Sequence, residues 1–359
     1  MIIKTPWAFY EEYLPPEIID RESERSMLRM FLSPLLTGQP LLQSMFVTGT
    51  VGVGKTALTK FILRDLPSAG IYFKLSEADS SLPRILYKII VALGIPIPAY
   101  TYSNIVLMKL IQWFNDQKKT SLLVLDDFEK IPLKAIRPLL HDIPRETPWC
   151  NFLIISRLPA ALEGLPADTK STLRCRELAL PPYNKETIFQ ILKQRVTLAL
   201  QENAMDDKLL ELIAKDCESY GSSRAAIEIL QMSCRLADQF NEDKVTQNDV
   251  EIAIDMIDKR SLEETIKDLP PYHKLILKCL NNQPQEYSNI YHIWKFSLSE
   301  NGLKNLSIYR FRDFISDLKK YELIEIERRG RGRGCGIKHS LFLRPEIYKL
   351  VKGGIVKNE

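Results

Sequence analysis

The stretch that decides the fold is Phe46-Val47-Thr48-Gly49-Thr50-Val51-Gly52-Val53-Gly54-Lys55-Thr56, in which an apolar strand runs into G-x-x-x-x-G-K-T. Glycines allow backbone N–H groups to curl around phosphate oxygens, and the N-terminus of the following helix adds positive potential. Lys55 is expected to reach the β- and γ-phosphates, and the Thr56 hydroxyl to bind Mg²⁺. The stretch therefore predicts a site for ATP or ADP with Mg²⁺, formed by Gly49, Val51, Gly52, Val53, Gly54, Lys55, Thr56 and Ala57.

Apolar segments around this loop predict a parallel sheet. Strands alternate with helices up to residue 180, which implies right-handed crossovers. The strands are rich in Ile, Val, Leu and Phe, as in sheets that are covered on both faces. Strands are expected at 43–47, 70–74, 121–125 and 151–156, and helices at 55–65, 80–93, 102–117 and 134–142.

Beyond residue 180 the pattern changes to helices alone, expected at 185–202, 206–218, 222–241 and 246–258. The last hundred or so residues have the pattern of helices followed by a hairpin. A chain of 359 residues is long for one core. We therefore expect a nucleotide-binding α/β domain with an N-terminal arm over 1–180, a helical lid over 181–262 and a C-terminal domain over 263–359.

The apolar strand 121–125 ends in two carboxylates, Asp126 and Asp127. In phosphate-loop ATPases the first such carboxylate holds Mg²⁺ and the second polarises the attacking water. Thr56 and Asp126 are therefore the expected metal ligands and Asp127 the expected catalytic carboxylate, with a solvated acidic turn as the alternative. Aspartate is one methylene shorter than the usual glutamate, and a misplacement of about an ångström can cost about 10²-fold in rate.

Two arginines are candidates for contact with phosphate. Arg157 follows the strand 151–156 and should face the γ-phosphate, because ligands bind at the carboxyl edge of open parallel sheets. It is the second catalytic candidate, and a plain turn is the alternative. Arg224 lies in the first turn of a helix and can bind phosphate through two nitrogens. A surface arginine without a role in the site is the alternative there.

The C-terminal residues carry the positive charge. The formal net charge is +4, yet residues 307–359 hold 13 Lys and Arg against 7 Asp and Glu, so an anionic partner is expected there. A helix from Ser307, an amphipathic strand, an Arg-Gly loop and a return strand are typical of a winged helix-turn-helix that reads double-stranded DNA. Protein contact is the alternative use of such a wing. The residues expected to bind DNA are Ser307, Tyr309, Arg310, Arg312, Arg328, Arg329, Arg331 and Arg333.

With these segments the chain resembles the replication-initiator branch of AAA+ ATPases, the family of the archaeal and eukaryotic origin-recognition large subunit and its helicase-loading relative. The resemblance covers nearly the whole chain. It rests on residues 20–22, 49–56, 125–127, 180–183, 191–195, 221–226 and the segment from Leu306 to the Arg-Gly loop.

The resemblance implies an α/β fold class with three parts: an AAA+ P-loop parallel-sheet domain, a helical lid domain and a C-terminal winged helix domain that binds origin DNA. It implies ATP held between base and lid, beside Tyr183, Arg195 and Arg224, and a DNA contact through the 80–93 helix. The implied partners are origin DNA, the replicative helicase and a paralogous initiator on the same origin.

Three positions depart from the family pattern. Asp127 stands where glutamate is usual, Arg157 where asparagine is usual, and Asp168 where an arginine finger is usual. An arginine finger is worth about 10³–10⁵ in rate in related chemistry. We therefore expect an ATP-dependent switch that hydrolyses ATP slowly or not at all.

Two other functions stay open. A hexameric DNA motor of branch-migration type joins the same domains, but it needs fast hydrolysis. A signalling or transposition-regulator ATPase would use the winged helix for protein contact.

Composition points to the cytoplasm, with nucleoid association and no membrane partner. The chain has no run of 18 apolar residues and no signal-peptide layout. Its six cysteines form no C-x-x-C pair, so metal-ligand spacing is missing and reduced thiols are expected.

Overall fold

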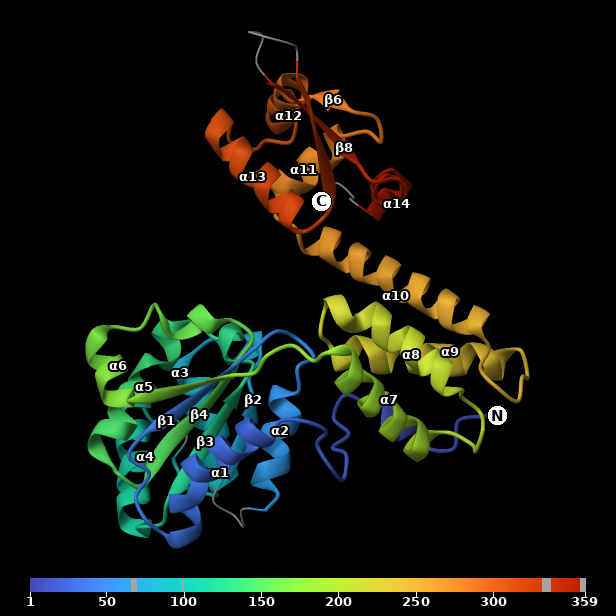
Figure 1. Ribbon diagram of the computed structural model, residues 1–359. Coiled ribbons are helices and arrows are strands. Elements are labelled where there is room, and N and C mark those ends of the chain that lie inside the picture. Colours follow the sequence, from blue (N-terminus) through green and yellow to red (C-terminus); the bar gives the residue numbers. More distant parts are fainter. Residues whose placement is uncertain (66–69, 99, 331–336, 356–359) are drawn as a thin grey trace. The chain divides into compact units, whose positions relative to one another are not determined.

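The computed structural model describes residues 1–65, 70–98, 100–330 and 337–355, and for 328–330, 337–338 and 354–355 it describes the backbone alone. The chain divides into two compact units, Met1–Ala253 and Ile254–Glu359. The first unit contains a parallel sheet and two groups of helices, and the second contains helices with a small antiparallel sheet (Figure 1).

The first unit is built on a five-stranded parallel sheet in the order β2-β3-β4-β1-β5, which confirms the expected parallel sheet. Its strands are β1 (Ser44–Thr48), β2 (Gly70–Lys74), β3 (Ser121–Asp126), β4 (Cys150–Ser156) and β5 (Cys175–Ala179). The helices around it are α1 (Glu22–Thr37), α2 (Lys55–Leu63), α3 (Leu82–Leu93), α4 (Ser103–Gln117), α5 (Leu133–Glu146) and α6 (Ala167–Leu173). Short 3-10 turns of this unit are η1 (Pro6–Phe9), η2 (Glu77–Asp79), η3 (Phe128–Lys130), η4 (Pro159–Leu162) and η5 (Cys217–Ser219).

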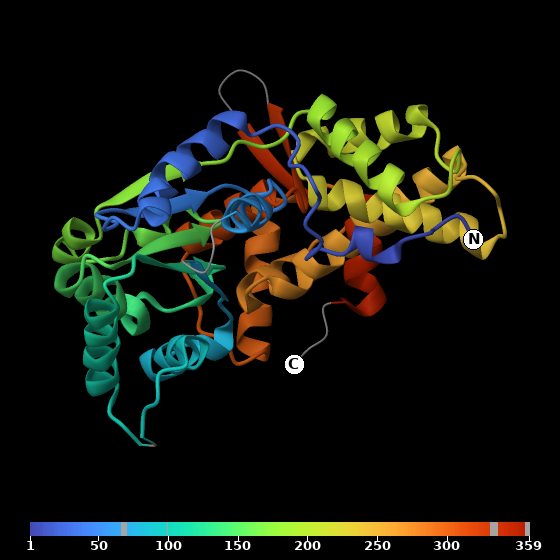
Figure 2. The same cartoon turned by 90° about the horizontal axis from the view of Figure 1, so that it is seen from below.

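Both faces of the sheet are covered, because successive strand residues point to opposite sides. One face packs on α1 and α2 through Met45, Val47, Leu122, Val124, Leu153 and Ile155. The other packs on α3, α4 and α5 through Phe46, Leu123, Leu125, Phe152 and Ile154. In Figure 2, α1 (blue) and α4 (teal) lie on opposite sides of the sheet. Since the strands are parallel, the loops after β1, β3 and β4 all start from one edge.

The structure adds a fifth strand to the four that the sequence predicts, on the side of β1 that faces away from β4. β5 pairs with β1 from Ser44↔Cys175 to Thr48↔Ala179, but it was not among the four expected strands. Only Leu178 of its five residues is buried, so the local pattern of this edge strand is too polar to reveal it. The short helix α6 was also not expected, and α10 (Gln247–Asp268) continues past the expected end at 258.

The remaining helices of the first unit form the lid, which confirms the expected helical unit after residue 180. They are α7 (Lys185–Ala199), α8 (Asp207–Asp216), α9 (Ser223–Gln239) and the start of α10. Asn184 caps α7 by accepting a hydrogen bond from the Thr187 N–H at 2.8 Å. The N-terminal arm packs on this lid, because Lys4 N–H donates to the Ala199 carbonyl at 2.8 Å and Ile3 forms a bridge with Leu200.

The second unit has helices on one antiparallel sheet of order β6-β8-β7. Its elements are α11 (Pro271–Cys279), β6 (Gln285–Glu286), α12 (Tyr287–Glu300), α13 (Ile308–Lys320), β7 (Ile324–Gly330), β8 (Ile337–Leu343), α14 (Pro345–Leu350) and a π-helical turn (Val351–Ile355). Ser307 caps α13, as its position suggests, by accepting from the Arg310 N–H at 3.5 Å. β7 extends to Gly330, so Arg328 and Arg329 belong to a strand, whereas the sequence placed them in the loop.

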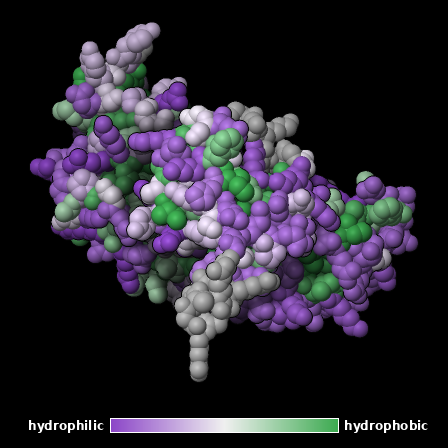
Figure 3. Space-filling model, turned by 90° about the horizontal axis from the view of Figure 1, so that it is seen from above, coloured by the Kyte–Doolittle hydropathy of each residue, from purple (hydrophilic) through white to green (hydrophobic). Residues whose placement is uncertain are grey.

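Over the described residues, no helix combines the length and apolar character needed to cross a bilayer. Figure 3 shows one face of the molecule, where hydrophilic side chains predominate and hydrophobic ones appear in separate small groups.

We predict that Trp294→Ala destabilises the second unit by about 3–5 kcal/mol. The Trp294 side chain is fully buried against Phe311 and Phe314, and its indole N–H donates to the Tyr272 carbonyl at 3.2 Å. Amide hydrogen exchange of α11–α13 in the full chain measures the change. Phe296→Ala is the control, because Phe296 lies on the same helix and is 67% exposed. Equal effects of the two substitutions would contradict this view of the core.

Candidate nucleotide site and nucleic-acid interface

The phosphate loop joins β1 to α2 at the carboxyl edge of the sheet. The Lys55 ammonium donates to the carbonyls of Gly49 and Thr50, both at 2.8 Å, so its side chain lies along its own loop. Burial lowers the pKa of Lys55, while the negative charges of Asp126, Glu129 and Asp127 oppose that lowering. A half-buried cation in contact with loop carbonyls is available to a phosphate that enters the loop.

The two expected metal ligands lie together. The Thr56 hydroxyl donates to Asp126 Oδ2 at 2.7 Å, and Asp126 is buried at the end of β3. Mg²⁺ prefers hydroxyl and carboxylate oxygens and takes few protein ligands beside waters and phosphates, so the donor set fits. Thr56 and Asp126 would hold the ion, which would neutralise phosphate charge. Among the described residues there is no cluster of three or more His, Cys, Asp or Glu side chains that could hold another metal.

Tyr72 of β2 is a further member of this group that sequence reasoning missed. Its hydroxyl donates to the same Asp126 Oδ2, and burial together with that carboxylate raises the pKa of Tyr72. Such outer donors orient a metal-binding carboxylate. No local pattern marks Tyr72, because the contact depends on the pairing of β2 with β3.

The lid rests directly on the phosphate loop. Ser223 donates to the Gly52 carbonyl through its N–H at 3.1 Å and its hydroxyl at 2.8 Å. Gly52 has φ +82°, and a Cβ there would overlap the Ser222 hydroxyl. At Gly54 a Cβ would lie 2.5 Å from the Tyr183 hydroxyl. These two glycines are needed for lid contact as well as for the turn.

Arg21 connects the arm, the loop and the lid, and sequence reasoning used it only among the residues that carry the family resemblance. It is 2% exposed. Its Nη2 donates to the Pro181 carbonyl at 2.6 Å and the Val53 carbonyl at 3.3 Å, and its guanidinium carbon lies 4.1 Å from the Tyr183 ring centroid. A buried arginine with these partners holds Tyr183 beside the loop.

The two arginines expected beside the nucleotide both contact the N-terminal arm. Arg195 is buried, donates to the Ala8 carbonyl at 2.7 Å and lies 4.7 Å from the Tyr13 ring centroid. Arg224 forms an ion pair with Glu11 at 3.2 Å, and both side chains are more than half exposed. The structure thus places Arg224 one residue after the Ser223 contact with the loop, and Arg195 on the arm.

The two expected catalytic residues have different partners. Asp127 has φ +57° and forms an ion pair with Lys130 at 2.8 Å. Arg157 Nε lies 3.0 Å from Oε1 of Glu129, and the Ser156 hydroxyl donates to Oε2 of the same residue at 2.7 Å. Glu129, whose side chain is 6% exposed, is therefore an acidic member of the site that sequence reasoning missed. Its place two residues after Asp127 was the available signal.

The position of the expected arginine finger holds a carboxylate that is already partnered. Asp168 lies in α6, where Arg137 Nη2 approaches it at 3.4 Å.

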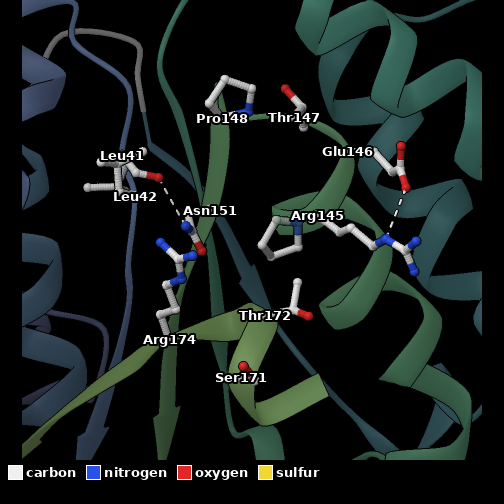
Figure 4. Close-up of a pocket in the computed structure, with 11 residues that line it drawn as sticks. Leu41, Leu42, Arg145, Glu146, Thr147, Pro148, Asn151, Ser171, Thr172 and Arg174 are labelled. Carbon is white, nitrogen blue, oxygen red and sulfur yellow. Dashed lines mark hydrogen bonds and ion pairs between the residues drawn. The ribbon is translucent and has the colours of Figure 1, made fainter. Parts of the chain in front are cut away.

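Arg174 precedes β5 and lies at the amino-terminal edge of the sheet, opposite to the phosphate loop. There it lines a cavity of about 420 Å³ with Leu41, Arg145 and Asn151 (Figure 4).

The residues expected to bind DNA gather in part on the first turns of α13. Tyr309, Arg310 and Arg312 are exposed, with the Arg312 guanidinium 5.9 Å from the Tyr309 ring centroid. Arg310 lies 3.7 Å from Asp313, and both side chains are exposed. Ser307 caps the helix. Arg328 and Arg329 lie on β7, while Arg331 and Arg333 lie outside the described residues.

Two protein families match parts of the chain. Residues 42–156 match the family described as AAA domain, and residues 189–255 match the Cdc6 AAA+ ATPase-type lid domain. The first range holds the phosphate loop with β1–β4, and the second holds most of α7 with α8 and α9.

Curated relatives match most of the chain. The ORC1-type DNA replication protein 1 of Sulfolobus acidocaldarius is 27% identical over 90% of this chain and 85% of its own length. The protein of the same name from Archaeoglobus fulgidus is 26% identical over 92% and 86%.

Solved structures share the fold. The Aeropyrum pernix ORC1 protein in complex with DNA has a TM-score of 0.73 at 24% identity, covering 98% of this chain and 97% of that one. The Aeropyrum pernix ORC2 protein in ADPNP and ADP complexes has a TM-score of 0.72 at 22% identity, covering 99% of each chain.

We predict that Gly52→Ala weakens nucleotide binding at least about tenfold, because the new methyl group pushes the lid away from the loop and strains a left-handed residue. Titration with a fluorescent ATP analogue measures this. Gly94→Ala is the control, since Gly94 has φ +65° and nothing within 4 Å of an added Cβ. It should cost about 1 kcal/mol of stability and leave affinity intact. Normal affinity in Gly52→Ala would contradict the proposed role of the lid contact.

Proposed function

Because the chain belongs to the AAA+ family of archaeal ORC1/Cdc6-type replication initiators, we propose that it is an ATP-binding initiator that recognises origin DNA. The observation that carries the proposal is a complete phosphate loop and a C-terminal arginine-bearing helix, α13, in one chain. Related proteins named for DNA replication match more than four fifths of their own length.

The proposed ligands are ATP or ADP with Mg²⁺. The phosphate loop supplies backbone N–H groups and Lys55, and Thr56 and Asp126 supply the metal ligands. The Aeropyrum pernix ORC2 protein, which shares the fold, was solved in ADPNP and ADP complexes, which supports nucleotide binding.

The proposed DNA reader is a winged helix within a third domain, 263–359, which follows a base over 1–180 and a lid over 181–262. α11, α12 and α13 are its helices, and β7 and β8 form the wing. α13 would enter a major groove, and the arginines of the hairpin would follow phosphates. A relative solved in complex with DNA supports this assignment.

Further partners are proposed on family grounds. α3, which carries the exposed Tyr87, is the proposed second DNA contact within the AAA+ domain. The replicative helicase and a paralogous initiator are the proposed protein partners, with the protein working in the cytoplasm at the nucleoid. Nucleotide state would bias DNA affinity and partner recruitment.

Hydrolysis is proposed to be slow or absent. Asp127 is bound by Lys130, Arg157 by Glu129, and Asp168 by Arg137. The carboxylate that should polarise water is thus paired with a lysine, and the position of the arginine that should act in trans holds a carboxylate.

We predict that the triple substitution of Arg329, Arg331 and Arg333 by alanine weakens DNA binding across sequences and lowers the salt slope by about three. Fluorescence anisotropy at several salt concentrations, on a duplex from the host's origin region and on an unrelated duplex, measures both. Lys295→Ala on α12 is the control, which removes one positive charge outside the hairpin. Unchanged binding by the triple variant would favour a winged helix that contacts protein. Footprinting of the origin region, with and without ATP, then tests recognition of a specific sequence.

We also predict that the purified protein binds ATP without rapid multiple turnover. Phosphate release under saturating ATP measures this, and Lys55→Ala provides the background. Fast hydrolysis that is stopped by Asp127→Asn would show an active motor instead of a switch.

A further inference from the structure

Asp127 and Glu129 are close to each other in the sequence, but their side chains differ in exposure and in binding partners. Asp127 is 29% exposed and bound to Lys130. Glu129 is 6% exposed, and both of its oxygens are engaged at the end of β4. Its Oε2 accepts from the Ser156 hydroxyl at 2.7 Å and the Arg157 N–H at 3.3 Å, while Oε1 faces Arg157 Nε at 3.0 Å.

This pair lies next to the phosphate loop. Ser156 pairs with Thr48 in the register of β4 and β1, and Gly49 follows Thr48. Glu129 and Arg157 bring opposite charges close to Lys55 of that loop. Both charges of the pair would therefore interact with a phosphate bound in the loop.

The side chains of Glu129 and Arg157 differ in how firmly their neighbours hold them. The Glu129 side chain is 6% exposed and is held by two hydrogen bonds and the ion pair with Arg157, whereas the Arg157 side chain is 55% exposed. A guanidinium has five N–H donors, and the contact with Glu129 is an ion pair in which Nε lies 3.0 Å from Oε1. Beyond this ion pair, the Arg157 guanidinium makes no hydrogen bond to the part of the chain that the structure describes. Arg157 therefore has N–H donors available to a phosphate, but its charge is offset by a carboxylate that the Ser156 hydroxyl and the Arg157 backbone N–H hold in place.

We propose that Glu129 is a specificity-determining residue: by pairing with Arg157 it offsets the cation that would detect a γ-phosphate, and so it weakens the preference of the site for ATP over ADP. The proposal rests on the proposed function as a nucleotide-binding initiator. ATP carries more negative charge than ADP at this edge, so a neutralised Arg157 distinguishes the two poorly. The site would thus hold ADP nearly as well as ATP.

The test measures ATP and ADP affinities of the full chain with Mg²⁺ by titration calorimetry. Glu129→Gln removes the charge and keeps an acceptor for Ser156. It should raise the ATP-to-ADP affinity ratio about five- to tenfold. Arg157→Gln should lower the ratio, because Glu129 is then unopposed. The double variant should return to within about twofold of the original ratio, because the pair is neutral in both forms.

Glu146→Gln is the matched control. Glu146 also pairs with a neighbouring arginine, Arg145, at 3.4 Å, but it precedes β4 and so lies at the opposite edge of the sheet. It removes the same charge and should leave the ratio unchanged. Thermal unfolding without nucleotide checks that all variants fold.

Three outcomes would overturn the proposal. Glu129→Gln could leave the ratio unchanged or weaken both nucleotides equally, which would make Glu129 merely structural. The double variant could keep the full gain of Glu129→Gln, so that the gain would not involve Arg157. Failure of the original protein to bind either nucleotide would overturn the proposed function as well, whereas normal binding with an unchanged ratio would overturn this inference alone.

Discussion

The Gly52 carbonyl accepts two hydrogen bonds from Ser223, and the arrangement of the nucleotide site depends on this contact. It joins residues that are 171 positions apart, so this geometry of the loop requires the folded lid. Contact this close leaves no room for a side chain at residue 52 and little at Gly54, where the Tyr183 hydroxyl approaches. The loop therefore contacts the lid on one side, and its other side is left for the phosphates of the proposed nucleotide. That sharing is what allows a nucleotide to influence the lid.

The N-terminal arm belongs to the same arrangement. Arg21, Arg195 and Arg224 satisfy groups of the arm, the loop or the lid that come from distant parts of the chain. Burying a guanidinium is costly unless its donors are paired. The terminal nitrogens of Arg21 meet that condition through two carbonyls and Glu24, and its guanidinium lies against the Tyr183 ring, while its Nε has no partner among the described residues. The exposed Arg224–Glu11 pair is weak by comparison, since solvent screens it. Arg224 is consequently the arginine that a phosphate could most easily draw away from its partner.

At the carboxyl edge of the sheet, charges are arranged for binding more than for chemistry. Asp126 is oriented by Thr56 and Tyr72, as a metal-binding carboxylate requires. The groups that should drive hydrolysis are instead paired with Lys130 and Glu129. A motor needs an unpaired carboxylate near the attacking water, whereas a switch needs only a nucleotide that binds its two conformations with different affinities. The geometry is consistent with the second requirement.

The sequence by itself determined the phosphate loop, the order of strands and helices up to β4, the helical lid and the cap of α13. Each depends on residues that are close in the chain or that repeat with the period of a strand or helix. Only the tertiary structure decided that Arg21 holds Tyr183, that Glu129 binds Arg157, that Tyr72 orients Asp126, and that polar Cys175–Ala179 forms β5. These facts depend on contacts between segments that are brought together by sheet pairing and lid closure, for which spacing along the chain contains no signal.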